Sequence, residues 1–186
     1  MFHRNFTAEL HCSKAPYVGR VGVTAALPGS LLSAEEDGWL VIDRRYKSHH
    51  VQPIRFKFEY QAHTEDRVHY MIASSTRFRG LADGTLGFSI NGYVGFYGIT
   101  TTHEVLNHVS PLYWALAKQA TVSYWKVEVL GAWDGTVEGA ERLDIHLRDS
   151  TGRRIAVNRA SINGDEYLNV ESGEVLTFQL RNVSLI

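Results

Sequence analysis

Alternation of strands and tight turns over residues 68–97 is the feature that most constrains the fold of this chain. Residues 68–73 are rich in β-branched and aromatic side chains, and residues 86–90 alternate in the manner of a strand. Asn91-Gly92 follows, and it is the strongest short hairpin signal in the chain, because both turn positions need positive φ and Asn and Gly tolerate it. Residues 93–97 then return as a further strand. The stretch therefore predicts antiparallel strands and no helix.

The same pattern occurs once before and once after this stretch. The chain divides into units at about residues 6–61, 68–130 and 142–186, each opening on a strand that ends in small polar residues and closing on an alternating strand. Units of this size cannot bury their apolar faces alone, so they must close on one another. Closure also removes exposed sheet edges, which otherwise invite aggregation. The sequence predicts one all-β domain over residues 1–186, built from three pseudo-repeats.

Residues 98–122 are the longest departure from this pattern. A connection longer than about 12–15 residues is uncommon unless it is functional or separately structured. Residues 110–118 predict a short helix, because a serine stands at the N-cap and a proline in the first turn. Leu112 and Leu116 would share the face that docks on the barrel, which leaves Trp114 as the predicted partner-binding anchor. Packing of Trp114 against a neighbouring loop is the alternative.

Composition narrows the classes of function. The chain has 186 residues, 44% hydrophobic and 21% charged, which is enough for one sizeable core. A net charge of −1 gives no overall basic field for nucleic acid or an anionic membrane, although it does not exclude a local patch. No apolar run approaches a membrane span, and the N-terminus lacks the apolar core of a signal peptide. A cytoplasmic location is expected, with export without a signal peptide as the alternative.

No catalytic or metal-binding pattern stands out, so we expect neither an enzyme nor a cofactor. His49-His50 would point to opposite faces of a strand, and a solvated loop pair is the favoured interpretation. His103-Glu104 and His108 miss the His-Glu-x-x-His zinc spacing by one residue. No serine lies in the context of a nucleophile elbow. Cys12 is the only cysteine, so no internal disulfide can form, and a buried inert thiol is expected at the end of the strand at 6–12.

An aromatic residue beside a polar turn recurs once in each unit. A sugar is held by a flat aromatic face against its C–H side and by carboxylate or amide groups on its hydroxyls, and such turns supply both. The alternative is that the aromatics fill the barrel and the polar residues only make turns. With the aromatic of the insertion added, the predicted ligand-binding residues are Asp37, Trp39, Asn91, Tyr93, Asp165, Tyr167 and Trp114.

Three units with these landmarks resemble the β-trefoil fold over about residues 6–186. The steps Tyr17-Val18-Gly19 and Phe78-Arg79-Gly80 are similar to those of lectin-like and fascin-like trefoils. The glutamine two positions before a tryptophan that marks ricin-type lectins is not present at Trp125 or at Phe178. A β-sandwich or a lipocalin-like barrel is the alternative fold.

The resemblance and the aromatic turns together imply a non-enzymatic, carbohydrate-binding lectin with a glycan as its ligand. The second interpretation is a protease inhibitor that presents residues 44–53 or 98–110 as an exposed loop on a rigid barrel. The third, implied by the fascin-like resemblance, is an intracellular scaffold that binds actin or another protein. A protein partner would use the insertion at 98–122. The sequence leaves the oligomeric state and the identity of the ligand open.

Overall fold

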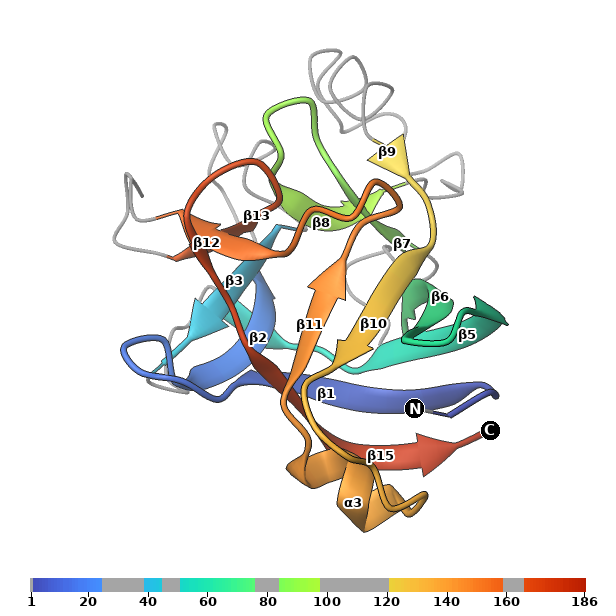
Figure 1. Cartoon of the computed structure of the whole chain (residues 1–186). Coiled ribbons are helices and arrows are strands. Elements are labelled where there is room, and N and C mark those ends of the chain that lie inside the picture. Colours follow the sequence, from blue (N-terminus) through green and yellow to red (C-terminus); the bar gives the residue numbers. More distant parts are fainter. Residues whose placement is uncertain (1, 25–38, 45–50, 76–83, 98–120, 159–165) are drawn as a thin grey trace.

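The computed structural model describes residues 2–24, 39–44, 51–75, 84–97, 121–158 and 166–186 (Figure 1). Over these ranges the protein is all-β, and its fifteen strands join into one continuous sheet with a single short helix beside it. No helix in the described ranges is long and apolar enough to cross a membrane. The all-β prediction is confirmed.

Six of the strands close into a barrel. They pair antiparallel in ring order, and the last pairs back with the first, so this ring has no free edge. In that order the strands are β1 (Phe6–Cys12), β5 (Phe56–His63), β6 (Arg67–Ser74), β10 (Trp125–Val129), β11 (Ile145–Arg148) and β15 (Phe178–Leu185). The closed barrel agrees with the prediction that the units close on one another.

The other strands form three groups of three, and each group follows one barrel strand. Each group contains an antiparallel pair and a short third strand, which pairs with the opposite edge of the first. The groups are β2 (Gly19–Thr24), β3 (Leu40–Asp43) and β4 (Val51–Pro53), then β7 (Thr85–Phe88), β8 (Val94–Tyr97) and β9 (Thr121–Val122), and finally β12 (Ala156–Asn158), β13 (Tyr167–Asn169) and β14 (Glu174–Val175). The same order of strands therefore repeats three times along the chain.

Alternation along the strands builds the core. In β1 every second residue is buried, from Phe6 to Cys12. The Phe6 ring stacks on Phe58 at 4.5 Å and meets Tyr70 edge-on at 5.4 Å. Trp125 is also buried, and its indole N–H donates to the Leu86 carbonyl at 2.9 Å. Each buried aromatic stabilises the fold by about 1.5–3 kcal/mol relative to an exposed one, so the barrel interior is the main source of stability.

The hairpin at Asn91-Gly92 forms, but with a different turn from the one expected. Only Gly92 has positive φ, at 77°. The Gly92 N–H donates to the Ser89 carbonyl, and the Ser89 N–H donates to the Tyr93 carbonyl. This is a three-residue loop, in which a left-handed glycine follows an ordinary turn. Asn91 therefore does not need the left-handed conformation that the two-residue turn would demand.

Toward the C-terminal end, the sequence predicts a glycine-rich connector over residues 131–141 and an apolar tail over residues 183–186, and both predictions need correction. The helix α3 (Val137–Arg142) lies in a stretch that reads as a glycine-rich connector. The Thr136 side chain caps it by accepting from the Gly139 N–H at 2.8 Å. The apolar tail at 183–186 is not separate, because β15 continues to Leu185 and pairs with Phe6. The helix predicted at 110–118 lies outside the described residues.

Candidate functional site

Three of the aromatic residues predicted to bind a ligand lie in one cluster. Trp39 and Tyr93 stack with ring centroids 5.1 Å apart and planes 9° apart. Tyr167 meets both rings edge-on, at 5.6 Å from Trp39 and 6.0 Å from Tyr93. Trp39 and Tyr93 are half-buried, whereas Tyr167 is buried. One flat face of Trp39 is therefore occupied by Tyr93.

Backbone bridges link the three groups of strands around this cluster. The pairing is cyclic. The backbone of each aromatic residue pairs with the strand of the next one, at the position two residues after that aromatic, and the third aromatic pairs with the strand of the first. The pairs are Trp39 with Gly95, Tyr93 with Asn169, and Tyr167 with Val41. The aromatic cluster thus lies where β3, β8 and β13 meet, and its position is fixed by backbone pairing as well as by ring contacts.

Of the polar residues predicted beside these aromatics, Asn91 lies in the described part of the chain. Asn91 is exposed in the hairpin turn, where its carbonyl accepts from the Asn169 side-chain amide at 3.0 Å. Asp37, Asp165 and Trp114 lie outside the described residues. The structure therefore brings together the aromatic half of the predicted sugar site, and glycan binding at these residues stays a prediction.

The connection from β3 to β4 is held firmly at its first residue. The Arg44 guanidinium makes a two-pronged ion pair with the Glu166 carboxylate, in which Nε lies 2.6 Å from Oε2 and Nη2 bonds Oε1. It also lies 5.1 Å above the ring of Tyr17, which is buried. A guanidinium bound at both prongs and stacked on a ring has little freedom to move.

The far end of the same connection is held by β4. Val51, Gln52 and Pro53 pair along the edge of β2. Gly22 permits this approach, because a Cβ atom at that position would lie 2.5 Å from the Val51 side chain and 2.8 Å from the Gln52 carbonyl oxygen. The segment at 45–50 is therefore anchored at both ends, by Arg44 on Glu166 and by β4 on β2.

The equivalent connections in the three strand groups differ in length. Between β13 and β14 the chain needs only residues 170–173, and Asn169 Oδ1 accepts from the Glu171 and Ser172 N–H groups at 2.7 and 3.1 Å. Gly173 completes that turn with a φ of 115°. The connection after β3 takes the seven residues 44–50, and that after β8 takes the twenty-three residues 98–120. Part of this difference follows from register. The chain returns four positions along β2 between Asp43, opposite Arg20, and Val51, opposite Thr24, but only one position along β12 between Asn169 and Glu174.

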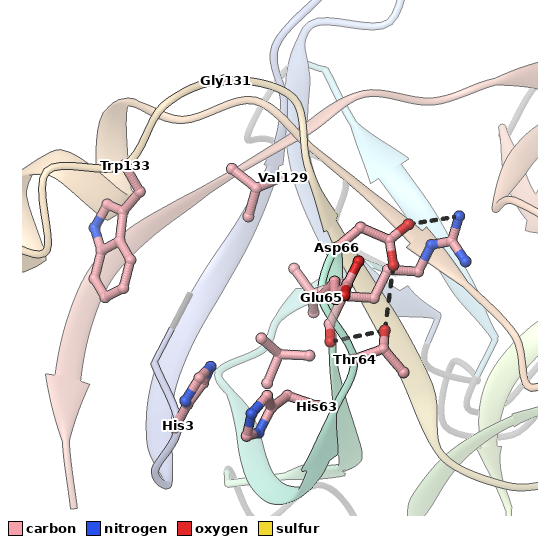
Figure 2. Close-up of a pocket in the computed structure, with 11 residues that line it drawn as sticks. His3, His63, Thr64, Glu65, Asp66, Val129, Gly131 and Trp133 are labelled. Atoms are coloured by element: carbon pink, nitrogen blue, oxygen red, sulfur yellow. Dashed lines mark hydrogen bonds and ion pairs between the residues drawn. The ribbon is translucent and has the colours of Figure 1, made fainter.

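A cavity of about 320 Å³ opens beside the β5–β6 turn (Figure 2). The His3 and His63 rings stack at 4.2 Å, and Trp133 lies across the opening. Asp66 is held by Arg67 at 3.1 Å and by the Thr64 hydroxyl at 3.2 Å. Loss of solvation and then the charge of the neighbouring His63 lower the pKa of the exposed His3. The pocket was missed in the sequence, because its walls come from three separate segments.

Metal ligation and thiol reactivity depend on how side chains are grouped and buried in the described ranges. They contain no group of three or more His, Cys, Asp or Glu side chains placed to hold a metal ion. Cys12 is buried, and burial raises the pKa of its thiol, with the charge of Glu166 adding to the effect. A thiol in that state does not form the reactive thiolate near neutral pH. His49, His50, His103 and His108 lie outside the described residues.

Comparison with known proteins assigns no family. No protein-family model matches the chain, and no curated protein matches it. One solved structure that matches is "The Crystal Structure of the Double-headed Arrowhead Protease Inhibitor A in Complex with Two Trypsins", at 11% identity over 95% of this chain and 88% of that chain, with a TM-score of 0.48. The assignment to a lectin-like or fascin-like trefoil is therefore wrong, because the comparison leads to an inhibitor of proteases instead.

Proposed function

We propose that the protein binds another protein through the β3–β4 connection, and that this partner is a serine protease that cleaves after arginine or lysine. The observation that carries the proposal is the connection itself. It is anchored at Arg44 and at β4, and it is longer than the four-residue turn that serves the same purpose between β13 and β14. Function in rigid scaffolds is commonly placed on loops of this kind.

Fixed ends favour binding, because a flexible segment must lose conformational entropy when it binds a partner. A segment whose ends are already fixed loses less conformational entropy when it enters a protease cleft. The intervening sequence, Arg45-Tyr46-Lys47, offers two cationic side chains. Proteases of the trypsin type recognise such a side chain with a carboxylate at the base of their specificity pocket. Residues 45–50 lie outside the described residues, so the proposal rests on their sequence and on the two anchors.

The threefold arrangement of a β-trefoil is inferred for the scaffold. It is supported by the strand order that repeats three times and by the cyclic backbone pairing around the aromatic cluster. The connection after β8, residues 98–120, occupies the equivalent position to the proposed binding segment, and it is the second candidate for contact with a partner. A non-enzymatic role, a single domain and a cytoplasmic location remain predictions.

Titration of protease activity tests this function. A panel of serine and cysteine proteases at fixed concentration receives increasing amounts of the protein. We expect the activity of a trypsin-type enzyme to fall to zero near one molar equivalent. Either Arg45→Ala or Lys47→Ala should weaken inhibition by about 100-fold, the size of a hot-spot loss. The control Arg181→Ala removes an exposed arginine of β15 and should change nothing.

Two results would reject the proposal. The first is a panel in which no serine protease is inhibited by folded protein. The second is inhibition that persists unchanged in the Arg45→Ala, Lys47→Ala double variant, because the cationic side chains would then have no part in recognition.

A further inference from the structure

Basic residues line the outer face of the barrel at β6, β10 and β11. His69 lies opposite Lys126, Lys126 opposite Arg148, and Arg148 opposite Arg154. Residues directly opposite each other in an antiparallel sheet point to the same side. The residues next to the first three in their strands, among them Tyr70, Trp125 and Leu147, are buried, so this row faces outward. Four positions at three strand spacings extend over about 14 Å.

A second row lies beside the first, with Glu128 between Arg67 and His146. The Glu128 carboxylate accepts from Arg148 Nε at 2.9 Å and Nη2 at 2.8 Å. Arg154 lies 3.3 Å away, His146 3.1 Å and Arg67 4.0 Å. One carboxylate thus sits among three guanidinium groups and an imidazole.

The charges of this face do not cancel. Arg67, Lys126, Arg148 and Arg154 are four cations, whereas Glu128 and Asp66, the latter paired with Arg67 at 3.1 Å, are two anions. The excess is two positive charges, before either histidine is protonated, in a chain whose net charge is −1. A carboxylate offers about four acceptor sites, too few for three guanidinium groups with five N–H donors each.

The arginines of this face differ in how many of their N–H donors form hydrogen bonds within the protein. All three nitrogens of Arg148 are engaged, since the third donates to the Gly152 carbonyl at 3.0 Å. Arg154 is not, because its side chain is 38% exposed and its contacts with Glu128 are long, at 3.3 and 3.4 Å. Arg67 Nε is buried and has no hydrogen-bond partner among the described residues. Donors of Arg154 therefore remain accessible to a ligand at the edge of the Glu128 cluster.

We propose that this surface, the basic face (Arg67, His69, Lys126, His146, Arg148 and Arg154), binds a sulfated polysaccharide. Guanidinium groups bind oxyanions through two parallel hydrogen bonds, which suits sulfate groups. A row about 14 Å long fits an extended polyanion better than a single ion. Single-stranded nucleic acid fits less well, because its bases need aromatic rings to stack on. The nearby Tyr124 ring is already stacked on His69 at 4.9 Å, and the Lys126 ammonium lies 5.8 Å from its centre.

Binding at the basic face is independent of the proposed protease contact. The face is built by β6, β10 and β11, whereas the protease segment follows β3. Each function can therefore fail in experiment without the other.

Heparin is the probe, measured by calorimetry with the full chain at several salt concentrations. The test variant is Lys126→Gln with Arg154→Gln. The matched control is Lys57→Gln with Arg181→Gln. Both residues pair with β1, and β1 lies directly across the barrel from β10, so the control residues are far from the basic face. Both double variants change the net charge by −2. We expect the test variant to bind heparin at least about tenfold more weakly, and the slope of log affinity against log salt to fall by roughly two, one for each lost contact.

Three outcomes would overturn the proposal. They are equal weakening by the test and control variants, no heparin binding by the unaltered protein at low salt, and tighter binding of single-stranded DNA or anionic vesicles than of heparin. Melting curves check that each variant is folded. If the test variant is not folded, the single change Arg154→Gln, at a side chain that is 38% exposed, is measured instead, and unchanged heparin affinity there also overturns the proposal.

Discussion

Glu128 shows how one residue organises a surface. Hydrogen bonds from Arg148, helped by those from His146 and Arg154, lower the pKa of its carboxyl to about 2. The carboxylate therefore stays ionised across the physiological range and keeps the neighbouring guanidinium groups in place. Its own charge is more than balanced by its partners, which is why an acidic residue lies at the centre of a basic surface.

The lowered pKa of Glu128 makes a prediction about pH. Because the folded-state pKa lies below the usual value of 4.5, the carboxylate stabilises the fold above pH 4.5, and this stability is lost as the pH falls toward 2. We expect Glu128→Gln to lower the free energy of unfolding at pH 7 by about 1–2 kcal/mol, a discounted figure because the side chain is partly exposed. The measurement is urea unfolding from pH 7 to pH 2.5.

The control for this prediction is Glu65→Gln, which removes the same charge from an exposed turn residue. Its effect should be close to zero at every pH. A stability loss for Glu128→Gln that stays constant down to pH 2.5 would contradict the assigned pKa, because the ionised carboxylate could not then be its cause.

At the scale of elements, the aromatic cluster links β3, β8 and β13. Trp39 and Tyr93 stack on each other and each meets Tyr167, while backbone bridges join the same strands. These contacts favour a role in holding the strand groups together. The cluster also shows why a pattern of aromatics beside turns is ambiguous in a sequence, since the same residues suit packing and sugar binding alike.

Truncation of the stacked rings tests this role. Trp39→Ala and Tyr93→Ala should each lower the free energy of unfolding by about 2–4 kcal/mol, because each leaves a cavity and removes a ring contact. Thermal melting should show a drop of several degrees. Ile90→Ala is the matched control, an apolar residue of the same hairpin that is 59% exposed, and it should melt near the unaltered protein. A Trp39→Ala melting curve that coincides with the control would show that the cluster does not stabilise the fold.

Element by element, the sequence was informative where alternation is visible. The strand at 6–12 was predicted because apolar residues alternate there, and the structure buries every second residue, namely Phe6, Ala8, Leu10 and Cys12. Helix α3 was not predicted, since it has six residues with a glycine inside and gains its position from contacts with β15, such as the Val183 N–H to Glu141 at 2.7 Å. Its local signals are the Thr136 cap, the acidic Glu138 in the first turn and the basic Arg142 in the last turn.

At the scale of the whole molecule, pairing between distant strands decides what the surface can do. The outward positions of β6, β10 and β11 could be read from alternation, but the neighbours of each strand could not. His69 and Arg148 become part of one row only because β10 pairs with both strands. The pocket beside His3 and His63 depends on distant segments in the same way. The overall charge of −1 hides this uneven distribution.

The central claim is that a rigid barrel presents the anchored β3–β4 connection to a trypsin-type protease. Native mass spectrometry of the protein mixed with trypsin, followed by mapping of cleaved bonds, tests it most directly. We predict a complex of one protein with one protease, in which cleavage of the chain is absent or confined to residues 44–50. Free protein and trypsin without a complex, with the chain cut at many lysines and arginines, would contradict the account.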